Sequence, residues 1–107
     1  YCVIDGDTFR LGQRRIRVVG IDTAEIKARC PAEAEQARAS TEALLEWLNR
    51  GPFELTSRID EPTDRYGREL GIVTRKAGGV KVERLADWMR EHGGARGYDG
   101  EFREGWC

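Results

Sequence analysis

A single long helix set between short strands is the feature that most constrains the fold of this chain. From Pro31 to Arg50, small and apolar residues recur at helical spacing, Pro31 suits a first helical turn, and Gly51-Pro52 ends the pattern. The flanking segments show the alternation of apolar and polar residues that is typical of strands. In chain order, the predicted elements are strands at residues 1–4, 9–11 and 14–21, the helix at 31–50, strands at 53–59 and 68–75, and a second helix that begins near Val82 and that Gly93-Gly94 ends.

This order of three strands, a helix, two strands and a helix indicates the fold class. Five short strands with a helix between the third and the fourth suit a small closed or partly open barrel, the layout of an OB-fold. A chain of 107 residues can build one modest core and is too short for two. We therefore expect a single α+β domain over residues 1–107: a five-stranded Greek-key β-barrel of the OB-fold type with two to three helices.

Composition and charge narrow the range of partners. Charged residues make up 35% and apolar residues 39% of the chain, and no apolar stretch approaches the ~20 residues that span a bilayer, so we expect no membrane partner. The formal net charge is −1, whereas nucleic-acid binders usually carry a basic surplus. Such a binder would contact only a short stretch of backbone or focus its basic residues locally. The run Arg14-Arg15-Ile16-Arg17 favours local focusing, although a solvated strand face explains it about equally well.

The cysteines and the single histidine argue against a zinc site. Cys2, Cys30 and Cys107 are widely spaced, and His92 is most simply the end of the second helix, next to a glycine. The odd cysteine count fits either a partner in upstream residues or one disulfide with one free thiol. We expect upstream residues, because Tyr1–Ile4 reads as the middle of a strand. The sequence leaves the location open, and disulfides would fit a secreted or periplasmic protein.

Two acidic clusters stand where predicted strands end or bend. They are Asp5-Gly6-Asp7-Thr8 and Asp22-Thr23-Ala24-Glu25. Carboxylates brought together at such points could hold a hard cation through oxygen ligands. Each cluster taken alone is more often explained by the ordinary use of Asp and Gly in turns and caps. An EF-hand is excluded, because the acidic spacing and the closing Glu of its loop are absent.

Two arginines could bind a phosphate beside such a cation. Arg17 precedes Asp22 by five residues, and Arg68 begins another predicted strand. Arg17 lies on the face of its strand opposite to Ile16 and Val18, which we expect to face the core. A guanidinium group donates two parallel hydrogen bonds to a phosphate and never loses its charge. Each arginine alone is more commonly a surface side chain, so only their convergence would indicate a site.

Three motifs in order together resemble the staphylococcal nuclease family. They are Val3-Ile4-Asp5-Gly6-Asp7-Thr8, Ile16-Arg17-Val18-Val19-Gly20-Ile21-Asp22-Thr23-Ala24-Glu25 and Asp64-Arg65-Tyr66-Gly67-Arg68. One such motif is weakly specific, but three in order, with five residues from Arg17 to Asp22, are a specific match. The resemblance runs from the first residues through the second helix. Residues 48–55 and the closing Gly105-Trp106-Cys107 also resemble bacterial, often exported, members.

This resemblance implies a calcium-dependent nuclease that hydrolyses phosphodiester bonds of DNA and RNA by in-line attack of water and leaves 3′-phosphates. Its implied partners are single-stranded or locally melted DNA and RNA, and we expect a monomer. The matching positions are Asp7, Asp22 and the backbone carbonyl of Thr23 as Ca²⁺ ligands, Asp5 as a nearby acidic residue, Glu25 as the group that activates or orients water, Arg17 and Arg68 as catalytic phosphate ligands, and Tyr66, Arg65 and Tyr98 as substrate-binding residues.

The chain also departs from the family pattern. Ala24 stands where proline is usual, residues 26–30 form a shorter loop, Asp99-Gly100 follows Tyr98 where a second tyrosine is expected, and the chain is mildly acidic. None of these changes removes a functional group from the positions assigned above, apart from that second tyrosine. We therefore expect weaker, more salt-sensitive substrate binding with the catalytic groups intact.

Two alternative functions for this chain involve no catalysis. One is an OB-fold module that binds nucleic acid or protein, although such family members typically lose the acidic and arginine positions that are present here. The other is a structural OB-fold that uses its tryptophans as a contact surface. Trp47 and Trp88 lie in or beside helical apolar stripes, so we expect them to pack in the core instead.

Overall fold

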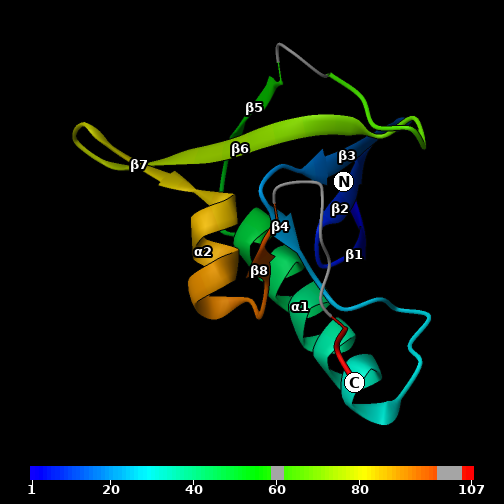
Figure 1. The fold of residues 1–107 in the computed structure, drawn as a ribbon. Helices are drawn as coiled ribbons and strands as arrows, with labels where there is room; N and C mark the ends of the chain where they lie inside the picture. The colour runs from blue at the N-terminus through cyan, green and yellow to red at the C-terminus, as the bar shows by residue number, and fades with distance from the viewer. Residues whose placement is uncertain (59–61, 99–104) are drawn as a thin grey trace.

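The computed structural model describes residues 1–58, 62–98 and 105–107, which form two β-sheets and two helices (Figure 1). The elements are β1 (Cys2–Asp5), β2 (Thr8–Leu11), β3 (Arg14–Val18), β4 (Ile21–Asp22), α1 (Pro31–Asn49), β5 (Glu54–Ser57), β6 (Glu69–Gly78), β7 (Lys81–Arg84), α2 (Leu85–His92) and β8 (Arg96–Gly97). The predicted α+β class is therefore confirmed. Neither described helix is long and apolar enough to cross a membrane.

The main sheet is mixed. Strands β1, β2 and β3 form an antiparallel meander, and β3 then pairs in parallel with β6, which also pairs with β5 and β7. A parallel pair needs a crossover connection, and here the crossover contains α1. No pairing among the described residues joins β1 to β5. The sheet is thus compatible with a small barrel-like fold, but its described strands do not close into a barrel.

The register of β2 and β3 sorts their side chains onto two faces. Phe9 faces Ile16 across this pair of strands, and Thr8 faces Arg17. Since successive residues of a strand point to opposite sides, and Phe9 and Ile16 are fully buried in the core, Thr8 and Arg17 share the other face. Asp5 of β1 pairs with Thr8 and so lies beside them. The predicted position of Arg17, away from the core face of its strand, is confirmed.

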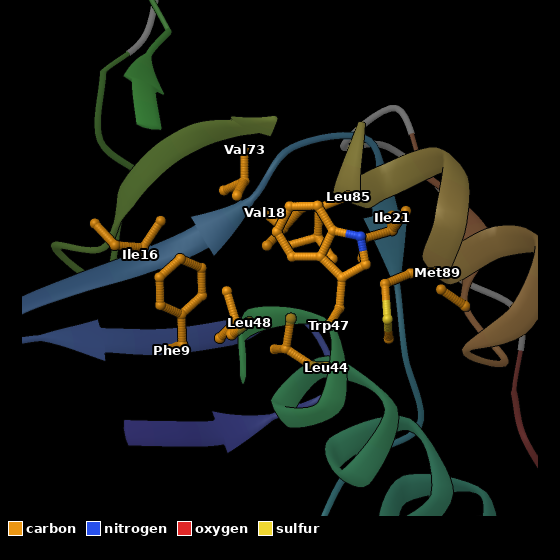
Figure 2. Packing of buried hydrophobic residues seen from close by; sticks show 11 residues of the cluster. Phe9, Ile16, Val18, Ile21, Leu44, Trp47, Leu48, Val73, Leu85 and Met89 are labelled. Carbon is orange, nitrogen blue, oxygen red and sulfur yellow. The ribbon is translucent and has the colours of Figure 1, made fainter. Parts of the chain in front are cut away.

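The apolar core lies between the main sheet and the two helices. Figure 2 shows Leu44 and Trp47 of α1 among side chains that come from the sheet and from α2. Trp47 is fully buried, and its indole N–H donates to the Glu83 carboxylate. Trp88 packs against the cluster and is partly buried, so both tryptophans contribute to the core as predicted. The buried cluster comprises Phe9, Ile16, Val18, Ile21, Leu44, Trp47, Leu48, Val73, Leu85, Met89 and Ala95.

The turn after β6 corrects two predicted boundaries. Strand β6 continues to Gly78 instead of ending at Arg75, and Val82 belongs to β7 rather than to the second helix, which begins at Leu85. Gly78 and Gly79 adopt positive φ angles of 112° and 57°, so the chain turns back there and β7 pairs with β6. Val82 stands at helical spacing from the buried residues of α2, but it is 58% exposed.

Other predicted elements match more closely. The helix predicted at 31–50 is α1, which ends one residue earlier. The strand predicted at 14–21 is divided into β3 and β4, because Gly20 turns the chain with a φ of 90°. Strand β5 ends at Ser57, and the predicted end of that strand at Ile59 lies outside the described residues. His92 is the last residue of α2, as predicted.

A disulfide joins the beginning of α1 to Cys107. The Cα atoms of Cys30 and Cys107 lie 6.0 Å apart, and Cys2 is exposed with a free thiol. Of the two explanations for the odd cysteine count, the structure therefore supports one disulfide with one free thiol. The Cys30 sulfur also caps α1 by accepting a hydrogen bond from the Glu33 N–H. The bridge thus anchors one end of the segment that carries Glu25.

Candidate active site

The tight turn between β1 and β2 brings the first acidic cluster against the second. The Asp5 carboxylate accepts a hydrogen bond of 3.1 Å from the Asp7 N–H, which closes the turn. Gly6 leaves no room for a side chain, since a Cβ atom there would lie 2.6 Å from the Ser40 Cβ and 2.8 Å from the Thr23 Oγ1. The turn therefore lies directly against both α1 and the second acidic cluster.

Asp7 is the residue at which the two acidic clusters meet. Its carboxylate accepts hydrogen bonds from the Thr8 hydroxyl at 2.9 Å and from the Thr23 N–H at 3.3 Å. Asp7 is 6% exposed, and Asp22, directly before Thr23, is 3% exposed. The Thr23 hydroxyl oxygen is also buried and has no hydrogen-bond partner within the described part of the chain. Buried oxygen atoms of the two clusters thus lie in one region.

Negative charge is concentrated in this region. Burial, as the largest cause, raises the pKa of the Asp5 carboxyl to about 7, and the charge of Asp7 and, to a smaller extent, that of Glu25 contribute to this effect. The exposed Glu25 carboxylate thus acts on Asp5 through its charge. Carboxylates this close repel one another, and a cation among them would relieve the repulsion.

Arg17 supplies a buried positive charge beside the acidic turn. Its guanidinium Nη2 lies 3.6 Å from Oδ2 of Asp7, and its Nη1 donates to the Val18 carbonyl at 2.8 Å. Arg17 is 8% exposed, and its guanidinium carbon lies 5.7 Å from the centre of the Tyr98 ring. These contacts hold the guanidinium next to the acidic turn, with an aromatic ring close by.

Arg68, just before β6, reaches the same face. Its Nη1 donates to Oγ1 of Thr8 at 3.4 Å, and that hydroxyl donates in turn to Asp7. Its Nε and its backbone N–H both donate to the Asp64 carboxylate, at 2.7 and 3.0 Å. The structure therefore brings Arg68, Arg17 and Asp7 together, which is the convergence that the motifs predict.

The predicted substrate-binding residues lie around these arginines. Tyr66 is 60% exposed, and its ring centre lies 5.4 Å from the Arg68 guanidinium carbon and 5.1 Å from that of Arg65. Tyr98 lies beside Arg17, and its backbone N–H donates to the Gly20 carbonyl. An exposed ring next to a guanidinium group is suited to stack on a nucleobase while the arginine contacts the phosphate.

The predicted calcium ligands agree with calcium in chemistry but do not form a complete group. Asp7, Asp22 and the Thr23 carbonyl are oxygen donors, which calcium prefers. However, over the described ranges, no three His, Cys, Asp or Glu side chains gather in an arrangement that could hold a metal ion. Asp7 is already engaged by Arg17 and by two hydrogen bonds. The predicted donors are thus of the type that binds calcium, but the described side chains do not form a complete site.

Two residues of the site were given no role by the sequence reasoning. Thr8 joins Asp7 to Arg68. Its position opposite Arg17 could have indicated this role, but that position follows only from the pairing register of β2 and β3. Asp64 holds Arg68. Burial alone would raise the pKa of the Asp64 carboxyl, but the hydrogen bonds from Arg68 and Tyr66, together with the Arg68 charge, lower it below its ordinary value. The signal for Asp64 was its place four residues before Arg68 in a polar loop.

The site as a whole combines the guanidinium groups of Arg17 and Arg68 and the buried acidic oxygens at the β1–β2 turn with the exposed Tyr66 beside Arg68 and the exposed carboxylate of Glu25. Such a set can bind an anionic phosphate and can activate a water molecule beside it. No protein-family model and no curated protein matches this chain.

Proposed function

We propose that this protein is a calcium-dependent nuclease of the staphylococcal nuclease type, which hydrolyses phosphodiester bonds in DNA and RNA. The observation that carries the proposal is the link from Arg68 through the Thr8 hydroxyl to Asp7, with Arg17 on the same carboxylate. We further propose that β1, β2, β3, β5 and β6 are the five strands of an OB-fold barrel, whose mixed order supports this assignment.

Arg17 and Arg68 bind the phosphate that is cleaved. A phosphodiester is anionic, and the attack of water places further charge on its oxygens. Two guanidinium groups held in advance stabilise that charge without having to reorganise. Their present contacts, with Asp7 and with Asp64, keep them in position before the substrate arrives. Calcium held by Asp7, Asp22 and the Thr23 carbonyl would supply a Lewis acid that neutralises one phosphate oxygen.

Glu25 activates the attacking water. Its carboxylate is exposed, so water has access to it, and its charge acts on the Asp5 carboxyl. As the water oxygen bonds to phosphorus, Glu25 accepts a water proton and the bond to the 5′ oxygen breaks. The 5′ oxygen then takes up a proton, so the products are a 3′-phosphate and a 5′-hydroxyl. The ribose 2′-hydroxyl takes no part, and both DNA and RNA are substrates.

Incubation of the purified chain with denatured DNA, in calcium or in a calcium chelator, tests the proposal. We expect degradation in calcium and none in the chelator. Arg68→Ala should abolish most of the degradation. Intact DNA under both conditions, in a protein that folds and binds DNA, would contradict the enzyme proposal.

That outcome would instead support a non-catalytic binding module. One observation favours this second candidate: the described residues include no group of three side chains arranged to hold a metal ion. The Asp7–Arg17 ion pair and the hydrogen bond from Arg68 to Thr8 count against it, because they keep both arginines at the acidic turn.

A further inference from the structure

Two more arginines lie on the face of the sheet that carries the proposed active site. Arg10 faces Arg15 directly across the β2–β3 pair, two residues along each strand from Thr8 and Arg17. Because side chains alternate along a strand, Arg10 and Arg15 share the face of Thr8 and Arg17. Both are exposed. We call Arg10 and Arg15 the arginine pair.

The arginine pair has an excess of unused donors. The Arg10 side chain forms no hydrogen bond or ion pair with any described residue. Arg15 uses its Nη2 to donate to the Tyr66 carbonyl at 2.6 Å, which leaves most of its five donors for a ligand. Like charges directly opposite one another in a sheet are destabilising, and a bound anion would relieve that repulsion.

Contact with Tyr66 ties the arginine pair to the site. The Arg15 guanidinium lies against the turn at residues 66–67, where a Cβ on Gly67 would be 3.2 Å from Nη2. Arg15 precedes Arg17 by two residues, so their Cα atoms lie ~7 Å apart along the strand. An anion held by the arginine pair would therefore be next to one held by Arg17.

Arg14 shows the contrasting arrangement on the same strand. It lies on the opposite face, where its Nε and Nη2 donate to both Glu69 carboxylate oxygens at 2.9 and 2.8 Å. Its charge is thus neutralised within the protein. Arg14 is therefore a matched control: an exposed arginine one residue from Arg15 that faces away from the site.

Resting on the proposed function, we propose that the arginine pair binds backbone phosphates of a single-stranded polynucleotide, adjacent to the phosphate held by Arg17 and Arg68. The chain has a net charge of −1, so a local row of cations is needed to attract a polyanion. The arginine pair then contributes to the binding of long strands and not to the binding of a substrate with a single phosphodiester.

Binding is measured first, by fluorescence anisotropy with a single-stranded DNA of about 20 nucleotides in a calcium chelator, so that no cleavage occurs. Arg10→Gln and Arg15→Gln should each weaken binding about threefold, as expected for an exposed charge contact. Each should also lower the slope of log K against log salt by about 0.7. Arg14→Gln should leave both quantities unchanged. Equal slopes for all three variants would overturn the proposal.

Cleavage is measured second, in calcium. Arg10→Gln and Arg15→Gln should raise KM for the long strand and leave kcat, and the KM for a dinucleotide, unchanged. An equal loss on the dinucleotide would contradict the proposal, because the change would then act on the cleaved phosphate itself. If the unaltered protein cuts neither substrate, the nuclease proposal fails, and the salt slopes still decide whether the arginine pair binds the strand. Thermal unfolding of each variant confirms that it folds.

Discussion

The arginines near the two ends of β6 lie in contrasting environments. Arg75, toward the end of the strand, has its guanidinium carbon 3.9 Å from the centre of the Trp47 ring. It donates to the carbonyls of Trp47, Gly51 and Pro52 at 2.6, 3.0 and 3.2 Å. Arg68, before the strand begins, contacts a carboxylate and a hydroxyl instead.

We take this difference to separate a structural arginine, Arg75, from Arg68, for which we propose a catalytic role. The partners of Arg75 are carbonyls at and just after the end of α1, so this cation closes the helix terminus against the sheet. Burial lowers the pKa of the Arg75 guanidinium, although the nearby Glu83 charge opposes that effect. The partners of Arg68 are side-chain oxygens, and in the proposed mechanism phosphate oxygens join them. We therefore expect changes at the site to alter activity, and changes at Arg75 to alter stability.

The largest expected effect is on the activity side of this comparison. Glu25→Gln should slow turnover by about 10²–10⁴-fold, the usual contribution of a general base. The Tm should change much less than the turnover, because Glu25 is exposed. Single-turnover cleavage and thermal unfolding by circular dichroism measure the two quantities. Full activity in this variant would remove Glu25 from its assigned role.

Arg68→Ala is expected to come next, with kcat lower by about 10²–10³-fold, as for the loss of one preorganised donor. Arg65→Ala is its matched control, because both guanidinium groups lie next to the Tyr66 ring and only that of Arg68 reaches Thr8. The control should change KM alone. Equal kcat losses in the two variants would show that the Thr8 contact does not distinguish them.

The stability side is tested by Arg75→Ala. Loss of the carbonyl hydrogen bonds and of the contact with Trp47 should lower the free energy of unfolding by about 2–3 kcal/mol. Turnover per folded molecule should be unchanged, because Arg75 is remote from the acidic turn along β6. Urea unfolding followed by Trp fluorescence gives the stability. A loss of activity without a loss of stability would reverse the roles inferred from the comparison.

The smallest expected effect concerns pH. The pKa of the Asp64 carboxyl is lowered in the folded state, so its stabilising effect is present above its ordinary pKa and is lost as the pH falls through the lower folded value. Asp64→Asn should therefore be slightly less stable than the unaltered protein at pH 7, by about 1 kcal/mol or less. This difference should vanish toward pH 2. A difference in Tm between Asp64→Asn and the unaltered protein that stays constant from pH 7 to pH 2 would contradict the lowered pKa of Asp64.

Much of the local structure could be predicted because it depends on local patterns. The helical repeat predicted α1 to within one residue, and strand alternation predicted that Arg17 faces away from Ile16. Helical spacing failed at Val82, because the paired glycines before it return the chain to β6 and pairing with β6 decides its conformation. Spacing alone could not reveal that competing partner.

The sequence by itself determined the two helices and the order of the strands β1, β2, β3, β5 and β6, the two faces of β2 and β3, and the residue types that the proposed chemistry needs. It missed β7 and β8 and the break between β3 and β4. Only the tertiary structure decided that Thr8 joins Asp7 to Arg68, and that Cys30 is bonded to Cys107. The physical reason is the range of the interactions. Periodicity reflects neighbours within a few residues, whereas these contacts join residues 60 and 77 positions apart that meet only when the sheet, α1 and the loops have packed together.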